Sequence, residues 1–284
     1  AAANIAIQMG AKPVFAEVDS ETWCMNSTSI EKCLSSKTRA IVPVHTYGNI
    51  CEMGGIMELA QKNNIPVIED AAEAFGSKYK GNWAGSIGDI GTFSFQATKT
   101  ITTGEGGMVI TNGKDLNNKM SLYISHGMLR KKYYWHELPG HNFRITNLQA
   151  ALGCGQLEHL DEIAKERKRV HKTYKRVLEN EDGITLQKFG TDVEPVLWAF
   201  AVKLDPKAFP QGRDAVIGQM KEKQIETRPG FYPPTLMKQL YNSGPLPVCE
   251  EIGLNVISLP TFPSLSDEQI CFICESLLNL TNSY

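Results

Sequence analysis

The residues best suited to chemistry lie between Glu69 and Met108. Asp70 ends one apolar run, Ser94 lies in a second, and Lys99 follows Ser94 by five residues, with a glycine-rich turn over 104–107. A carboxylate can pair with a protonated ring nitrogen, a hydroxyl can hold a phosphate, and a partly desolvated amine can form an imine. These residue types together suggest a site for a cationic heterocycle that carries a phosphate and reacts with an amine.

Each of these residues also has a simpler interpretation. Lys99 could be an exposed lysine in a hairpin, and Asp70 could cap a helix. Glu73 could be an exposed helix residue, and Ser94 alone means little. His45 follows another apolar run and could contact a ligand or serve as a structural histidine.

Composition narrows the function classes. The 284 residues are 42% hydrophobic and 21% charged, with a formal net charge of -2, so we expect no nucleic acid or membrane partner. No apolar run reaches the roughly 20 residues that span a bilayer. Seven cysteines do not suggest a disulfide framework, which favours a reducing cytoplasm. The Cys271/Cys274 pair lies in an amphipathic pattern over 267–280, so we interpret it as helix core and expect no metal site.

Apolar runs alternate with helical spacing through the first half of the chain. Strands are expected over 13–18, 40–44, 66–68, 93–95 and 108–111, and helices over 2–9, 29–34, 54–63 and 116–125. This alternation predicts a parallel sheet flanked by helices, whose ligands gather at the carboxyl ends of the strands. A long helix is expected from 147 onward. We predict a large domain over 1–165 and a small α+β domain over 166–284.

The central motifs resemble the sugar aminotransferases of the DegT/DnrJ/EryC1/StrS family, which are pyridoxal 5'-phosphate (PLP) enzymes. The resemblance is carried by EDAAEAFGS, YKGNWAGSIGDIGTFSFQATK, TITTGEGGMVITN and, over 140–151, GHNFRITNLQAA. It implies an α/β chain of PLP-dependent transferase fold type I, the aspartate aminotransferase-like fold, with a mostly parallel sheet flanked by helices and a smaller α+β C-terminal domain. No part of the sequence resembles that fold's N-terminal segment, so we expect the sequence to begin partway through it.

The resemblance also implies roles for individual residues. Lys99 would form the Schiff base with PLP, and Asp70 would bind its pyridine nitrogen. Ala72 would pack on one face of the ring, and Ser94 would contact the phosphate. The remaining position is Asn142, which would reach the phosphate of a partner subunit's cofactor and so implies a homodimer with shared active sites.

By family analogy, the chain would move an amino group from glutamate to a nucleotide-linked 4-keto-6-deoxy sugar for a surface glycan. Glu73 would face the cofactor's ring oxygen or the substrate. Many relatives carry glutamine there, and glutamate is similar to the perosamine-synthase branch, which acts on a GDP-linked sugar. A sugar dehydratase on the same scaffold is an alternative, but those relatives replace the lysine with histidine. A non-catalytic, truncated homologue is a further alternative, and the nucleotide and ketone carbon stay open.

Overall fold

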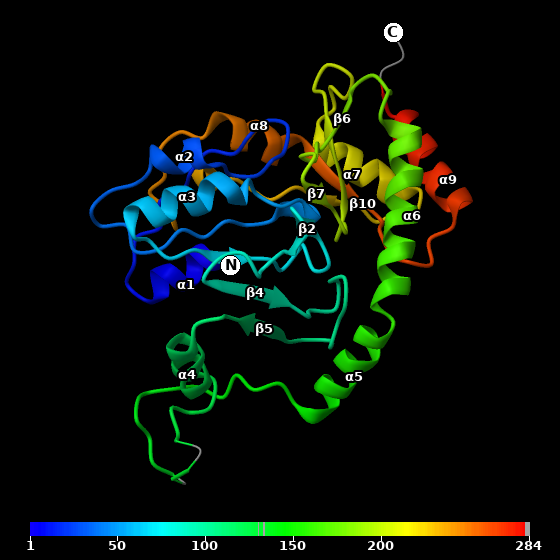
Figure 1. The fold of residues 1–284 in the computed structure, drawn as a ribbon. Helices are drawn as coiled ribbons and strands as arrows, with labels where there is room; N and C mark the ends of the chain where they lie inside the picture. Colours follow the sequence, from blue (N-terminus) through cyan, green and yellow to red (C-terminus); the bar gives the residue numbers. More distant parts are fainter. Residues whose placement is uncertain (130, 133, 282–284) are drawn as a thin grey trace.

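The computed structural model describes residues 1–129, 131–132 and 134–281 (Figure 1). Its helices are α1 (Ala2–Gln8), α2 (Ser27–Glu31), α3 (Met53–Asn63), α4 (Lys114–Tyr123), α5 (Asn147–Glu158), α6 (Leu160–Leu178), α7 (Arg213–Glu222), α8 (Pro247–Asn255) and α9 (Asp267–Leu278). Its strands are β1 (Ile68–Asp70), β2 (Lys78–Tyr79), β3 (Asn82–Trp83), β4 (Ile90–Ser94), β5 (Gly107–Ile110), β6 (Ile184–Leu186), β7 (Val193–Glu194), β8 (Phe200–Leu204), β9 (Arg228–Pro229) and β10 (Val256–Leu259).

The sheet that matters for the site has the order β1-β4-β5. β1 and β4 are parallel, with Asp70 opposite Thr92, while β5 returns antiparallel to β4. The segment 41–44 lies along the other side of β1 through parallel bridges at Ile41 and Val44. The parallel part of the sheet therefore places the ends of 41–44, β1 and β4 at the same edge.

Two further sheets involve the second half of the chain. One has the order β6-β8-β10-β9, with antiparallel neighbours throughout. The other pairs β2 with β3 and also with β7, so a strand from the second half completes a hairpin from the first.

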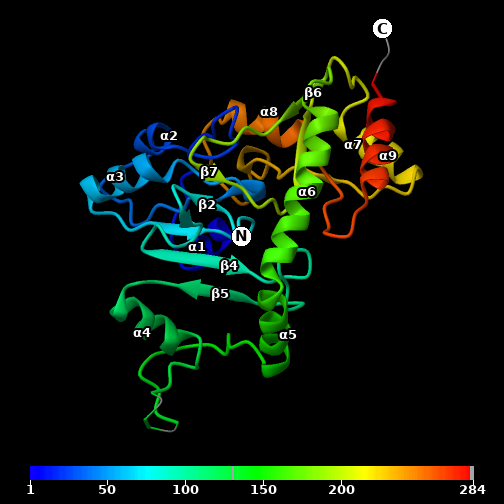
Figure 2. The same ribbon diagram turned by 45° about the vertical axis from the view of Figure 1, so that its right-hand side comes forward.

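Two large clusters of buried apolar side chains stabilise the fold. The N-terminal cluster gathers residues between Cys24 and Ala84, and the C-terminal cluster gathers residues between Val170 and Leu277. Helix α6 supplies Val170, Tyr174 and Leu178 to the C-terminal cluster and packs on α9, as both views show (Figure 1 and Figure 2). The domain boundary near residue 165 stays a prediction.

Side-chain caps fix where several helices begin. Thr146 and Gln149 form a capping box at the start of α5, and Ser266 and Gln269 form another at α9. Such reciprocal bonds satisfy backbone N–H groups that have no partner within the helix. The caps therefore set the point at which the loop before α5 ends.

Some local expectations differ from the structure. Residues 13–18 form no strand, because only Val18 finds a ladder partner, at Met25. Residues 40–44 make isolated bridges and no continuous ladder, consistent with Pro43 having no N–H to donate. The helix expected from 147 is divided at His159, whose backbone leaves the helical conformation.

Among the described residues, no helix is both long enough and apolar enough to cross a membrane. Cys274 packs inside the C-terminal cluster, as the helix-core interpretation expects, whereas Cys271 is only half-buried and lies outside that cluster.

Candidate active site

Asp70 and Ser94 project from one face of the sheet. Asp70 pairs with Thr92 in the β1–β4 register, and Ser94 lies two residues beyond Thr92 on the same strand. Because side chains alternate along a strand, Asp70, Thr92 and Ser94 share a face. Both predicted residues are half-buried at the strand ends, so the structure brings this carboxylate and this hydroxyl to one edge.

Lys99 lies in the turn after β4 and faces Glu73. Its Nζ is 3.8 Å from Glu73 Oε1, and the two side chains are only 14% and 10% exposed. The other oxygen of Glu73 accepts a hydrogen bond from the Tyr47 amide at 2.9 Å. Glu73 is therefore a buried residue in the turn after β1, and the interpretation of it as an exposed helix residue is wrong.

Burial sets the ionisation of Glu73. Desolvation raises the pKa of this carboxyl to about 7, since the Tyr47 amide and the Lys99 charge only partly oppose it and the Asp70 charge adds to the rise. A carboxyl with this pKa exchanges a proton near neutral pH. Asp70 and Lys99 both lie close enough to Glu73 to act on its charge.

Aromatic rings line the approach to Lys99. The ammonium Nζ lies 4.0 Å from the ring centroid of Trp198, and the indole Nε1 donates to the carbonyl of Thr98 at 2.7 Å. Tyr47 stacks on Trp198 with an interplanar angle of 7° and on Phe231 with an angle of 19°. These rings restrict the directions in which the Lys99 side chain can move.

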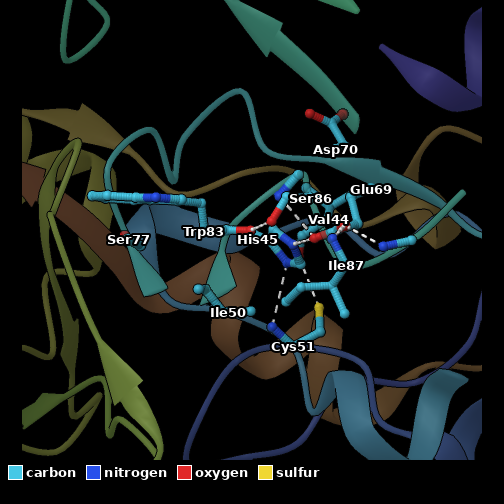
Figure 3. A network of polar contacts seen from close by, with 12 residues as sticks. Val44, His45, Ile50, Cys51, Glu69, Asp70, Ser77, Trp83, Ser86 and Ile87 are labelled. Atoms are coloured by element: carbon cyan, nitrogen blue, oxygen red, sulfur yellow. Dashed lines mark hydrogen bonds and ion pairs between the residues drawn. The ribbon is translucent and has the colours of Figure 1, made fainter. Parts of the chain in front are cut away.

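The opposite face of β1 holds a structural network (Figure 3). Glu69 is fully buried and accepts hydrogen bonds from His45 Nε2 at 3.0 Å and from the amides of Gly85, Ile87 and Gly88 at 2.8, 2.6 and 2.5 Å. Figure 3 shows the carboxylate of Asp70 pointing away from this network. The neighbouring acids of β1 thus serve opposite faces.

His45 belongs to this network. Its Nδ1 accepts from the Cys51 amide at 3.3 Å, which leaves Nε2 to carry the proton that it donates to Glu69. The ring is fully buried. The structural interpretation of His45 therefore holds.

Asn142 lies apart from the other predicted residues. It is exposed, bridges to Ser125 near the end of α4, and accepts a bond from the Arg144 amide at 3.4 Å. Within the described part of the chain, no contact joins it to Lys99, Asp70 or Ser94. Its predicted role needs a second subunit.

Comparison with known proteins agrees with this geometry. Residues 1–278 match the model of the DegT/DnrJ/EryC1/StrS aminotransferase family. The chain belongs to this family. It is 42% identical to a GDP-perosamine synthase of Escherichia coli O157:H7 over 280 residues, covering 98% of this chain and 75% of that protein. It is 39% identical to the GDP-perosamine synthase of Caulobacter vibrioides over 273 residues, covering 95% and 73%.

Solved structures of similar aminotransferases share the fold. The Helicobacter pylori aminotransferase PseC, involved in pseudoaminic acid biosynthesis, superposes with a TM-score of 0.93 at 30% identity, covering 99% of this chain and 77% of that one. DesV of S. venezuelae gives a TM-score of 0.91 at 28% identity, covering 100% and 76%. The sugar aminotransferase family and the type I fold expected from the sequence are confirmed, and PLP is the cofactor of this family member.

The residues present fit PLP. Among the described residues, the Asp70 carboxylate accepts a single hydrogen bond, from the backbone amide of Ala72 at 3.2 Å. The Ser94 hydroxyl accepts from the Gln96 amide at 3.3 Å and donates to no described acceptor. An amine, a carboxylate oxygen and a hydroxyl proton are thus available for the aldehyde, ring nitrogen and phosphate of PLP.

Sequence reasoning missed Tyr47, Trp198 and Arg167 as neighbours of Lys99. Nothing in the sequence around Tyr47 marks its backbone amide as a donor to Glu73. Trp198 and Arg167 reach Lys99 only through tertiary contacts. No local pattern could have identified them.

Proposed function

We propose that the chain transfers an amino group from glutamate to a GDP-linked 4-keto-6-deoxy sugar, placing the amine at C4 in a pathway to a surface glycan. The observation that carries this proposal is the buried carboxylate of Glu73, 3.8 Å from Lys99 Nζ. Glutamate at this position resembles the perosamine-synthase branch of the family. The GDP-perosamine synthases of E. coli, C. vibrioides and Vibrio cholerae, 42%, 39% and 34% identical to this chain, support the choice of sugar.

PLP supplies an aldehyde for the amine and a ring that withdraws electrons from the reacting carbon. In the proposed roles, Asp70 holds the proton on the ring nitrogen, Ser94 donates its hydroxyl to the phosphate, and Ala72 packs against one face of the ring. Lys99 Nζ takes a proton from the alpha carbon of the amino donor and later delivers a proton in the second half of the reaction.

Glu73 would accept a proton from Lys99 and return it. An amine accepts a proton from carbon only when it is neutral, and a carboxyl with a pKa of about 7 can take a proton from Lys99 Nζ and return it. The Tyr47 amide holds one carboxylate oxygen, so the other stays directed at the amine. A neutral glutamine could hold the same bond but could not accept the proton.

A substrate panel tests the proposal. The protein with PLP and glutamate is incubated with GDP-, UDP- and dTDP-linked 4-keto-6-deoxy sugars, and aminated products are identified by mass spectrometry. We expect amination of the GDP-linked sugar first. Amination of only the UDP or dTDP sugars would contradict the GDP assignment, and no amination by cofactor-loaded protein would contradict the enzyme assignment.

The proposal includes a homodimer that shares active sites. Exposed apolar side chains gather on α5 and the loop before it, where Leu148 is 85% exposed and Phe143 is 70% exposed. Such a surface suits a protein interface. The proposal also includes a reducing, cytoplasmic compartment, supported by the seven cysteines, all of which are free thiols.

Mixed dimers test whether the two subunits share their active sites. In a hybrid of Lys99→Ala and Asn142→Ala subunits, one site combines Lys99 of one subunit with Asn142 of the other if Asn142 acts across the interface. We expect hybrids to recover activity that neither parent has. A hybrid as inactive as its parents, with dimers present by light scattering, would show that Asn142 does not act in the partner's site.

A further inference from the structure

Arg167 is a buried cation on α6 that no described carboxylate neutralises. It is 5% exposed, and the described ion pairs of α6 involve its other charged residues, such as Arg169 with Glu166 and Asp267. Desolvation lowers the pKa of its guanidinium to about 10, which still leaves it charged at neutral pH. Its Nε is buried and has no hydrogen-bond partner among the described residues.

The guanidinium donates to backbone carbonyls of separate segments. Nη1 lies 3.2 Å from the carbonyl oxygens of both Leu197 and Trp198 and 3.5 Å from that of Thr261, and Nη2 lies 3.5 Å from that of Lys99. These segments are the turn that carries Lys99, the chain entering β8, and the chain leaving β10. They line a cavity of about 890 Å³, and the side chains of Lys99 and Arg167 are part of its wall.

These contacts connect Arg167, Trp198 and Lys99 to one another. Arg167 holds the Lys99 and Trp198 backbones, the Trp198 indole donates to the carbonyl of Thr98, and the Lys99 amine lies 4.0 Å from the Trp198 ring. A displacement of Arg167 would therefore move the lysine backbone and the ring beside its amine at the same time.

Burying an unpaired charge is costly, and carbonyl acceptors offset only part of the cost. A neutral side chain could fill this space at a lower cost in free energy. The planar fork of arginine offers several donors in fixed directions, which lysine does not. An arginine at this position is thus explained by the ability of its guanidinium to donate to several carbonyls at once.

The geometry points to Arg167 as a positioning residue for Lys99: its guanidinium fixes the lysine turn relative to Trp198 and so aims the amine at the cofactor aldehyde. The inference rests on the proposed role of Lys99. Arg167 touches neither substrate nor cofactor in this assignment and acts through the backbone it holds.

The test measures how fast Lys99 itself reacts. Folded protein is incubated with PLP, the linkage is trapped with borohydride at timed intervals, and labelled lysines are located by peptide mass spectrometry. We expect labelling of Lys99 to slow about tenfold in Arg167→Met and about threefold in Arg167→Lys, since the second variant keeps the charge but loses the fork. Labelling of exposed lysines such as Lys80 should not change.

Arg169→Lys is the matched control. Arg169 lies two residues along α6 and donates to the carbonyls of Pro263 and Leu265, but it does not contact the lysine turn. This variant should lose stability and keep the wild-type rate of Lys99 labelling.

The outcomes separate the two assignments. Wild-type labelling rates at Lys99 in folded Arg167 variants would overturn the positioning role and leave the role of Lys99 intact. Failure to label Lys99 in the wild type would overturn both. Loss of folding in both Arg167 variants would assign the residue to stability alone and overturn the proposal.

Discussion

Glu69 and Glu73 are both buried and lie four residues apart, but their surroundings differ. Glu69 is enclosed by hydrogen-bond donors: burial raises its pKa, but the bonds from His45 and the backbone amides of Gly88 and Gly85 outweigh burial, so its pKa is lowered. Glu73 has one amide donor and a lysine at 3.8 Å, and its pKa is raised to about 7.

The difference shows that burial alone does not mark a reactive acid. A carboxylate with all its acceptor sites filled stays ionised and organises the backbone around it. One with too few donors is held near its titration point, where it can exchange protons.

Lys99→Ala should have the largest effect. Loss of the amine removes both the group proposed to react with PLP and the cation facing Glu73, so turnover should fall by at least about 1,000-fold. The visible absorbance of lysine-bound PLP should disappear, as measured by titration with the cofactor. Lys80→Ala, at a surface lysine paired with Asp192, is the control. Retained absorbance in Lys99→Ala would show that PLP does not bind through Lys99, and Glu73 would then not face a reactive amine.

Glu69→Gln should mainly affect stability. The glutamine amide group would present donors to a pocket lined with donors, which leaves buried N–H groups unpaired. We expect a loss of about 3 kcal/mol in the free energy of unfolding, measured by denaturant titration. Glu58→Gln, on the exposed face of α3, should change stability by less than about 0.5 kcal/mol. An equally small loss in Glu69→Gln would contradict the structural role.

Glu73→Gln should change stability only above about pH 4.5. The pKa of Glu73 in the folded state, about 7, lies above the ordinary glutamate pKa of 4.5, so between these values the folded state binds more protons than the unfolded state. Stability of the wild type therefore falls as pH rises from 4.5 to 7 because of this group. The variant lacks this loss, so its free energy of unfolding should gain about 3 kcal/mol on that of the wild type between pH 4.5 and a pH above 7. A difference independent of pH would show that Glu73 does not titrate in this range.

The sequence predicted that Asp70 and Ser94 lie near the ends of strands. Asp70 ends one apolar run and Ser94 lies in a second, and a parallel pair of strands brings its carboxyl ends to one edge of the sheet. The shared face of the two side chains comes from the register of β1 with β4, which local pattern does not specify. The glycine-rich stretch before β4 also has a physical reason. A Cβ on Gly91, the second residue of β4, would lie 1.9 Å from the carbonyl oxygen of Gly85, so the turn that supplies amides to Glu69 can pack on β4 only if this residue is glycine.

Other features depended on contacts between distant segments. The ring beside Lys99 comes from Trp198, and the cation beneath its turn comes from Arg167, both from the second half of the chain. The strand expected over 13–18 does not form, because a strand needs a neighbouring segment to pair with and only Val18 has such a partner. Local pattern predicts which residues can react, and tertiary contacts determine what surrounds them.

The short turn Thr46–Gly48 connects the two acids of the comparison. His45 donates to Glu69 from one end, and the Tyr47 amide donates to Glu73 with Tyr47 in the left-handed region at φ 59°. Gly48 closes the turn against Val196 and Leu197, where a Cβ would lie 2.7 Å from a backbone oxygen. Lengthening this turn by one residue would therefore separate the group that donates to Glu69 from the group that donates to Glu73.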